Sequence, residues 1–268
     1  MLKVLDLFSG IGMFSYGLEK TGLYETVAFC EWDEICQQVL KKHWPHVEVF
    51  GDITEVEGHD GVVKWCYDRN PARDGVYDLY VSRGVDVITG GFPCQDVSSA
   101  NYHGEGLDGN RSGLWSEYKR LIKDIKPKGV IIENVTNLWR KGFQTVLQDL
   151  NSLGYDAEWH CIPASNFGAP HERDRIWIIA YPSGKQWQDA VSVEQSGKER
   201  FKKRTCGENL QEVCNSPFRQ SGSVPQPLLR GMDARDSSWV DRLRQVGNTV
   251  YWPIVEQLGY HVYENIVV

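Results

Sequence analysis

Stretches with strand-like and helix-like spacing of apolar residues alternate over the first 180 positions of this chain. The strand-like stretches are mostly apolar and rich in β-branched residues, which is typical of strands covered on both faces. The helix-like stretches place apolar residues on one face. We expect strands at residues 3–8, 26–32, 47–52, 85–89, 129–135, 156–162 and 175–181. We expect helices at residues 9–22, after an initial glycine turn, and at 33–44, 113–127, 143–154 and 250–258.

This alternation predicts an α/β fold with a doubly wound, mostly parallel sheet, because parallel strands need crossover connections between them. Asp33 is expected to cap the second helix, and Gly154 to end the fourth. The last two strands follow each other without a helix and are expected to close the sheet as a pair. Residues 55–84 separate two strands by more than such a core needs, and no function is assigned to them.

The alternating pattern ends after residue 181. Residues 182–238 are polar and rich in Ser, Gly, Gln and Pro, with poor periodicity. A loop of this length is uncommon in a compact chain unless it has a function, although a surface loop or linker is the simpler alternative. We therefore expect one catalytic domain, formed by residues 1–181 and 239–268, and a small irregular region at 182–238.

Charge and cysteine content narrow the class of protein. The net charge of −7 argues against unselective nucleic-acid binding, but residues 171–248 carry 13 Lys and Arg against 10 Asp and Glu, which permits a polyanion on one face. Seven cysteines without a CxxC pair predict reduced thiols in a cytoplasmic protein and no metal site. No apolar run approaches the ~20 residues of a membrane span, and no signal peptide is evident.

Three polar groups follow the first three strands, where open α/β sheets bind ligands. Gly10 and Gly12 form a glycine turn that opens a helix, although Ser15 replaces the third glycine of a dinucleotide fingerprint. Glu31 is placed to accept hydrogen bonds from ribose hydroxyls, Trp32 to lie against an adenine ring, and Asp52 to accept from an exocyclic amine. Ordinary turn chemistry explains each one alone, but together they favour a nucleoside ligand without a triphosphate.

The stretch "GGFPCQDVSSA" places Cys94 directly behind Pro93 at the end of the fourth strand. Pro93 stiffens the backbone, and a glycine-rich loop follows, so a nucleophilic thiol under a mobile cover is one interpretation. The alternative is a small buried hydrophobic residue, which is what most free cysteines are.

Candidate acid and cationic groups lie at the end of the fifth strand and at the start of the last strand. Glu133 comes after two apolar residues, where burial would raise its pKa and make it a proton donor to a ring nitrogen. Alternatively it caps a helix or forms a salt bridge. Arg173 and Arg175 occupy alternate strand positions and so share one face, which suits carbonyl or phosphate oxygens. A surface ladder with neighbouring acids is the alternative.

Together these stretches resemble the cytosine-5 DNA methyltransferases. The motifs "DLFSGIG", "EWD", "GDI", "GGFPCQ", "ENV", "ERDR" and "GN" occur in the family's order. The resemblance implies a Rossmann-like methyltransferase fold, S-adenosylmethionine as cofactor, S-adenosylhomocysteine as product and no metal. It implies that Cys94 is the nucleophile, that Glu133 holds or protonates N3 of cytosine, and that Arg175, supported by Arg173, contacts O2. The cofactor site would be formed by Phe8, Gly10, Gly12, Glu31, Trp32, Asp52, Ile53, Pro93, Leu114, Asn248 and Val250.

The function implied is methyl transfer to C5 of a flipped-out cytosine at a short site in double-stranded DNA, with residues 182–238 recognising the target. Base flipping is general for enzymes that modify a base within a duplex. A tRNA cytosine-5 methyltransferase would share every catalytic residue, and a catalytically silent DNA-binding relative is the second alternative. We expect a monomer that acts away from membranes, and a cognate restriction nuclease is a candidate partner.

Overall fold

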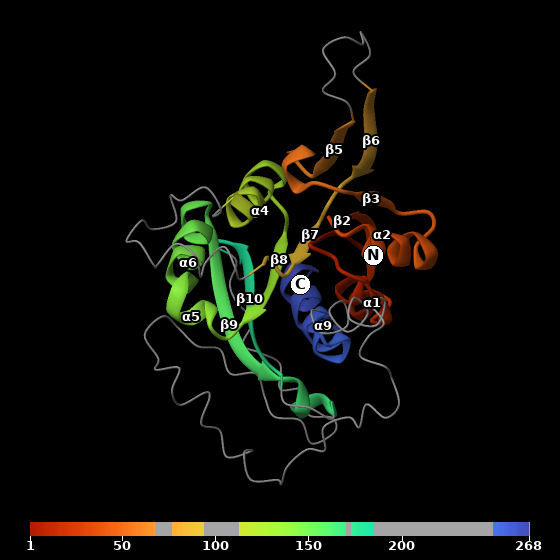
Figure 1. Ribbon diagram of the computed structural model, residues 1–268. Coiled ribbons are helices and arrows are strands. Elements are labelled where there is room, and N and C mark those ends of the chain that lie inside the picture. The colour runs from red at the N-terminus through yellow and green to blue at the C-terminus, as the bar shows by residue number, and fades with distance from the viewer. Residues whose placement is uncertain (68–76, 94–112, 170–172, 185–248, 268) are drawn as a thin grey trace, which may run out of the picture.

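The computed structural model describes residues 1–67, 77–93, 113–169, 173–184 and 249–267. Its main element is a seven-stranded sheet in the order β3-β2-β1-β7-β8-β10-β9 (Figure 1). The strands β1, β2, β3, β7 and β8 are parallel, and β10 runs antiparallel to both β8 and β9. The strands are β1 (Leu2–Leu7), β2 (Tyr24–Cys30), β3 (Glu48–Phe50), β7 (Val87–Gly90), β8 (Gly129–Val135), β9 (Tyr155–Pro163) and β10 (Asp174–Pro182).

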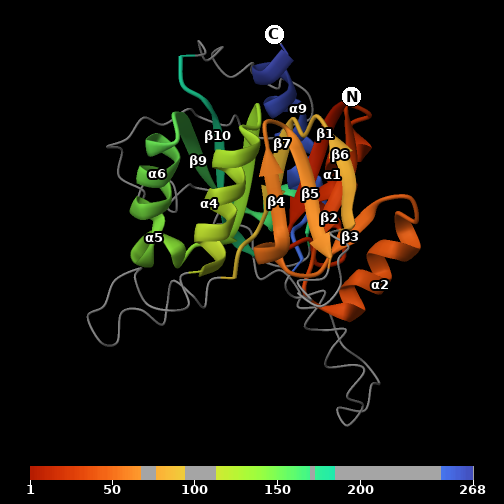
Figure 2. The ribbon, with the colours of Figure 1, turned by 90° about the horizontal axis from the view of Figure 1, so that it is seen from above.

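Helices cover both faces of this sheet, which confirms the doubly wound α/β fold. On one face α4 and α6 contribute to a core with Leu5, Ile88 and Ile132, and on the other α1 and α9 pack against Val4, Val87 and Ile131. Figures 1 and 2 show these two layers on opposite sides of the sheet. The helices are α1 (Met13–Lys20), α2 (Glu34–His43), α4 (Gly113–Ile125), α5 (Leu138–Lys141), α6 (Phe143–Ser152) and α9 (Trp252–Val267), with short 3-10 turns η1 (Ile53–Glu55) and η2 (Ala164–Phe167).

Local signals in the sequence explain several element boundaries. Asp33 caps α2 as predicted, since its side chain accepts hydrogen bonds from Ile35 N at 2.9 Å and Cys36 N at 3.1 Å. Gly154 follows α6 with a φ of +80°, a left-handed conformation that glycine adopts without strain. The prediction for the third strand was too long: β3 ends at Phe50, because Asp52 starts the η1 turn instead.

Residues 55–84 contain a second, three-stranded antiparallel sheet, which the sequence patterns did not predict. It consists of β4 (Val56–His59), β5 (Val62–Tyr67) and β6 (Tyr77–Arg83). Figure 2 shows β4–β6 beside α4. Val56 and Val63 are fully buried in the same core as α4. Main-chain bonds of 2.8 Å, from Asp60 N to Asp124 O and from Gly61 N to Ile125 O, attach this sheet to the end of α4.

The helix α9 continues beyond the predicted end at residue 258. It packs against α1 so closely that a Cβ on Gly17 would lie 2.7 Å from Val255 Cβ. Farther along, His261 Nε2 lies 2.5 Å from Glu158 Oε1 on β9, so the helix also reaches the edge of the sheet. Residues 185–248 lie outside the described residues, and the predicted target-recognition region at 182–238 stays a prediction.

Candidate active site

The turn between β1 and α1 uses left-handed backbone at three positions. The φ angle is +52° at Phe8, +54° at Gly10 and +86° at Gly12. A Cβ at Gly12 would lie 2.6 Å from the ring of Trp44, so packing excludes a side chain there. A Cβ at Gly10 would meet nothing within 4 Å. Gly10 therefore borders open space at the carboxyl end of β1, where a ligand can approach the backbone.

Glu31 follows β2 and connects two loops at this edge. Its Oε2 accepts a hydrogen bond from Gly10 N at 2.7 Å, and its Oε1 accepts from Asp33 N at 2.8 Å. Burial raises the pKa of Glu31, against the effect of these hydrogen bonds. Each oxygen has a further lone pair for a ligand hydroxyl. The next side chain, Trp32, is 75% exposed and offers an aromatic face for stacking.

Asp52 follows β3, which pairs in parallel with β2, so Asp52 and Glu31 lie at the same edge of the sheet. Asp52 Oδ1 accepts hydrogen bonds from both the main-chain N and the hydroxyl of Thr54, each at 2.9 Å. Among the described residues, Oδ2 remains available to a ligand donor. The side chain of Ile53 is buried in the core beneath this turn.

Gly90 at the end of β7 and Gly91 after it allow close packing around this strand end. A Cβ on Gly90 would lie 2.5 Å from the carbonyl oxygen of Leu7, and one on Gly91 would lie 3.0 Å from Glu133 Oε2. The residues just before Cys94 are therefore pressed against β1 on one side and against a candidate acid on the other. Cys94 itself lies outside the described residues.

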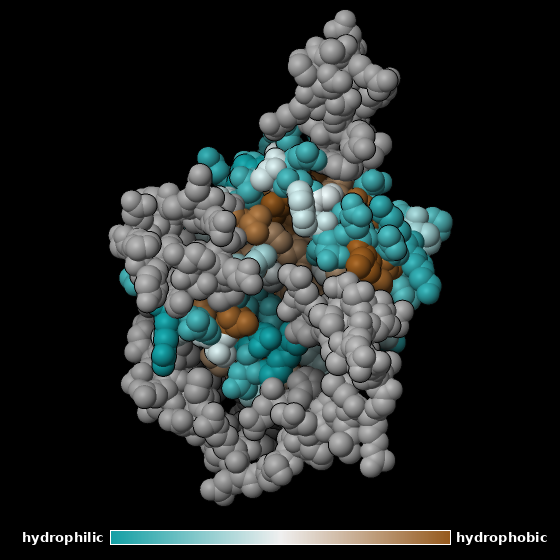
Figure 3. Space-filling view, viewed as in Figure 1, coloured by the Kyte–Doolittle hydropathy of each residue, from teal (hydrophilic) through white to brown (hydrophobic). Residues whose placement is uncertain are grey.

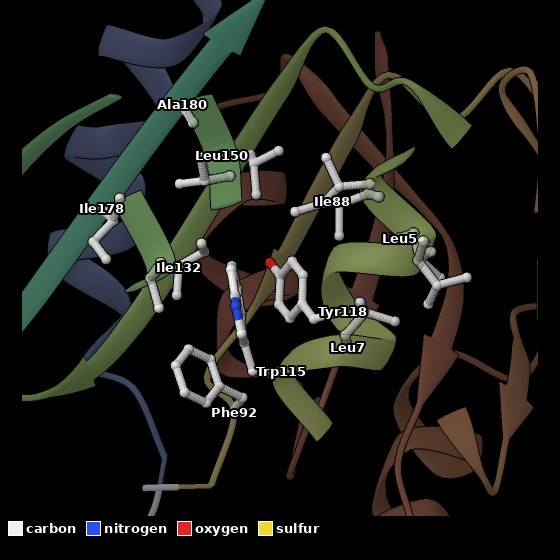
Figure 4. Close-up of a cluster of buried hydrophobic side chains, with 14 of the residues drawn as sticks. Leu5, Leu7, Ile88, Phe92, Trp115, Tyr118, Ile132, Leu150, Ile178 and Ala180 are labelled. Atoms are coloured by element: carbon white, nitrogen blue, oxygen red, sulfur yellow. The ribbon is translucent and has the colours of Figure 1, made fainter. Parts of the chain in front are cut away.

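The segment before Cys94 is anchored by the core. Phe92 is buried, and its ring centroid lies 5.2 Å from that of Trp115 on α4, which in turn lies 5.7 Å from that of Tyr118 (Figure 4). The side-chain amide of Asn134 donates a hydrogen bond to the carbonyl of Phe92 at 2.9 Å. Pro93 is exposed next to this anchor. We expect this packing to limit the movement of the backbone that carries Cys94.

Glu133 is the candidate acid, and the candidate cationic groups Arg173 and Arg175 act on it. It is 7% exposed, and Arg175 Nε lies 2.9 Å from its Oε1. The positive charge of Arg175 therefore lies directly beside the Glu133 carboxyl group. Burial raises the pKa of Glu133, while the positive charges of Arg175 and Arg173 lower it without cancelling the rise. A buried carboxyl with a raised pKa is suited to donate a proton.

The structure brings together most of the residues selected from the sequence. They lie at or just after the carboxyl ends of β1, β2, β3, β7 and β8, and the parallel alignment of these strands places all five ends at one edge. Arg175 reaches Glu133 from the antiparallel β10. Leu114 and Val250 are half-buried near the starts of α4 and α9. Cys94 and Asn248 lie outside the described residues. Asn134 and the buried Asp6 lie within the motifs "ENV" and "DLFSGIG", but no role was predicted for either, because the sequence does not show which distant groups they bind.

The described part of the chain contains no group of three His, Cys, Asp or Glu side chains that is arranged to hold a metal ion. None of the helices in that part is long and apolar enough to cross a membrane. On the face seen in Figure 3, hydrophobic residues occupy a central area that hydrophilic residues border.

The parallel strands, the antiparallel β10–β9 pair and the polar groups after β1, β2 and β3 place this chain among the α/β proteins whose sheets can bind a ligand at the carboxyl ends of the strands. A family model for C-5 cytosine-specific DNA methylases matches residues 2–226. The chain belongs to this family.

Curated relatives agree with this assignment. The chain is 33% identical over 187 residues to Type II methyltransferase M2.BsuMI of Bacillus subtilis, an alignment that covers 67% of this chain and 42% of the relative. It is 31% identical to Type II methyltransferase M.NgoBI of Neisseria gonorrhoeae, with coverage of 68% and 51%. The chain thus spans about half the length of the curated relatives it matches.

Solved structures show the same fold. Entamoeba histolytica methyltransferase EhMeth has a TM-score of 0.61 at 13% identity, with 100% of this chain and 99% of that chain covered. S. pombe Dnmt2 methyltransferase has a TM-score of 0.51 at 18% identity, with coverage of 69% and 52%. At these identities the likeness concerns the fold alone.

Proposed function

We propose that this protein transfers a methyl group from S-adenosylmethionine to C5 of a cytosine that is flipped out of double-stranded DNA, at a specific short site. The observation that carries the proposal is the buried Glu133, which lies against Gly91, three residues before Cys94, and is paired with Arg175. Membership of the C-5 cytosine-specific family supports the same reaction.

The residues at the ends of β1, β2 and β3 fit the cofactor. Gly10 borders open space, Trp32 offers an exposed aromatic face, and Glu31 and Asp52 offer carboxylate oxygens at the same edge. When bound, S-adenosylmethionine supplies the electrophilic methyl group. We propose that the site also includes Phe8, Gly12, Ile53, Pro93, Leu114, Asn248 and Val250.

The proposed chemistry begins with the target base, because C5 of cytosine is a poor nucleophile. Addition of the Cys94 thiolate to C6 forms a covalent intermediate and makes C5 electron-rich enough to accept a methyl group. Proton donation by Glu133 to N3 offsets the charge that develops in the ring. Arg175, supported by Arg173, is proposed to hold O2 of the base. Loss of the C5 proton then expels Cys94 and restores the aromatic ring.

The proposed function also includes target recognition, a biological role, an oligomeric state and a location in the cell. Residues 182–238 are proposed to recognise the target, because they separate the motif-bearing segments and carry none of the family motifs themselves. The relatives are Type II methyltransferases, which supports a role in restriction-modification with a cognate nuclease as a candidate partner. We propose a monomer that acts in the cytoplasm.

The test is a methylation assay on mixed-sequence duplex DNA with S-adenosylmethionine, followed by mapping of 5-methylcytosine at base resolution. We expect methylation in one short recurring context, lost in Cys94→Ala and retained in the control Cys161→Ala, whose thiol lies on β9. Methylation of tRNA but not DNA under the same conditions would refute the DNA substrate. Cofactor binding without methylation of either would indicate the catalytically silent relative.

A further inference from the structure

A carboxyl group that the proposed chemistry does not use lies beneath the candidate site. Asp6, near the end of β1, is fully buried, with 0% of its surface exposed. Its Oδ2 accepts hydrogen bonds from Ser15 Oγ at 2.8 Å and from Ser15 N at 3.3 Å, in the first turn of α1. Its Oδ1 accepts from Thr89 Oγ1 on β7 at 3.1 Å. One carboxyl group thus joins the cofactor turn to the strand that leads to Cys94.

The strand order places Asp6 between the two proposed ligands. Asp6 pairs with Thr89 across β1 and β7. In the proposed function the nucleoside lies over the ends of β2 and β3, beside Glu31, and the cytosine lies over the ends of β7 and β8, beside Glu133. The sulfur that carries the transferred methyl group must lie between them, over the ends of β1 and β7. Asp6 and Thr89 are buried polar residues beneath this boundary.

The charge state of Asp6 is sensitive to conditions near neutral pH. Burial raises the pKa of Asp6 to about 7, although the hydrogen bonds from Ser15 and Thr89 lower it, and the charge of Glu31 raises it further. The other titratable groups that interact with Asp6 are Cys30 on β2 and Tyr118 on α4. Burial raises the pKa of both, so they stay neutral and neither adds a second negative charge beside the ionised Asp6.

Resting on the proposed function, we propose that Asp6 is a positioning residue whose ionised carboxylate favours the positively charged S-adenosylmethionine over its neutral-sulfur product, S-adenosylhomocysteine. Methyl transfer removes the positive charge from the sulfur, so the attraction to Asp6 is lost when the reaction is complete. A charge in the protein interior acts over a longer distance than the same charge in water, because the interior screens it less. Asp6 therefore aids the exchange of product for fresh cofactor.

Linkage between charge and binding gives the proposal a measurable consequence. If the sulfonium charge lowers the pKa of Asp6 on binding, affinity for S-adenosylmethionine must rise with pH as Asp6 ionises, by about tenfold for each unit of pKa change. Affinity for S-adenosylhomocysteine must change much less. Groups that interact with the parts common to both ligands affect both affinities equally, so their contribution to the pH dependence cancels in the ratio.

The experiment measures dissociation constants of both compounds by calorimetry between pH 5.5 and 8, for the wild type and for Asp6→Asn. The amide keeps the shape of the side chain and removes its charge. We expect the wild-type ratio to favour S-adenosylmethionine by about tenfold more at pH 8 than at pH 5.5. In Asp6→Asn this pH dependence should disappear. An equal pH dependence in both proteins would overturn the proposal.

Two further variants separate a charge effect from a structural one. Thr89→Val removes one hydrogen bond that lowers the pKa of Asp6, so we expect the midpoint of the pH dependence to move upward. This result also tests the proposal if Asp6→Asn does not fold, and an unchanged midpoint would refute it. Glu31→Gln should weaken both ligands alike and keep the size of the pH dependence of their ratio, while its midpoint moves downward, because the charge of Glu31 raises the pKa of Asp6. If the wild type binds neither compound, the proposed function fails as well.

Discussion

The side-chain amide of Asn134 donates a hydrogen bond to the main-chain carbonyl of Phe92, 2.9 Å away and 42 residues earlier in the chain. Asn134 Oδ1 accepts from Val135 N at 2.9 Å, which fixes the orientation of the amide. The bond connects the end of β8 to the segment that precedes Cys94. The Asn134 side chain therefore links the strand that carries the proposed acid Glu133 to the segment that leads to the proposed nucleophile.

Replacing Asn134 tests the importance of this connection. Asn134→Ala leaves the buried carbonyl of Phe92 without its donor, which costs about 1–3 kcal/mol. We expect methylation to slow by about tenfold or more, because Cys94 is no longer aligned with the base. Cofactor affinity, measured separately, should change little, because the bond lies on the target side. Asn137→Ala is the matched control, because Asn137 is exposed three residues later, just before α5, and its side chain makes no capping hydrogen bond. Equal losses in both variants would contradict this interpretation.

The raised pKa of Glu133 predicts the pH dependence of the reaction. A proton donor must be in its neutral form, which is populated below its pKa, so the single-turnover rate should fall as pH rises past this value. Glu133→Gln cannot transfer a proton, and we expect a loss of about 10²- to 10⁴-fold together with the disappearance of this pH limb. Persistence of the same limb in Glu133→Gln would assign it to another group.

Two glycines with left-handed backbone allow the cost of backbone strain to be measured separately from the cost of a steric clash. Gly22→Ala adds a Cβ in left-handed backbone with nothing within 4 Å, so it should destabilise the protein by about 1–2 kcal/mol. Gly12→Ala adds the same strain and also places its Cβ 2.6 Å from Trp44 and 2.9 Å from Leu40. We expect a larger loss in the free energy of unfolding, measured by urea denaturation. Equal losses would show that Trp44 moves aside without cost.

The contact between α9 and the sheet predicts a loss of stability in acid. Burial alone would raise the pKa of Glu158, but the hydrogen bonds and charges of His160 and His261 outweigh this effect and lower it to about 2. A depressed carboxyl pKa contributes stability that is present above the unfolded value of 4.5 and is lost as pH falls toward 2. The full contribution is about 3 kcal/mol.

The measurement compares the unfolding free energy of the wild type with that of Glu158→Gln between pH 7 and pH 2.5. We expect the variant to be less stable at neutral pH and the difference to shrink below about pH 4.5. A difference that stays constant over this range would show that the ionised carboxylate does not contribute.

Sequence patterns predicted the main sheet well because its strands are apolar on both faces and its helices apolar on one. The Asp33 cap and the glycine after α6 were also readable, since each depends on residues only a few positions apart. Glu133 and Arg175 were selected individually, and the structure adds their 2.9 Å contact, which depends on the register of β8 and β10.

Features that depend on distant partners or on mixed patterns could not be predicted from the sequence. Asp6 gave no signal because a single acid in an apolar strand is informative only when Ser15 and Thr89 are known to surround it. The β4–β5 hairpin was missed although Asp60 and Gly61 form a plausible turn, because the alternation of apolar residues in its strands is irregular. Asp52 was placed in a strand because nothing local distinguishes a strand end from a short turn.

The attachment of β4–β6 to α4 has a consequence for engineering a smaller protein. Residues 55–84 are not a removable appendage, because Val56 and Val63 complete the core and Asp60 and Gly61 bind the last turn of α4. In this chain a small sheet takes the place beside α4 that a crossover helix would fill in a regular doubly wound fold. Shortening must therefore begin elsewhere, since a deletion here would uncover the very layer that supports Trp115 and Phe92.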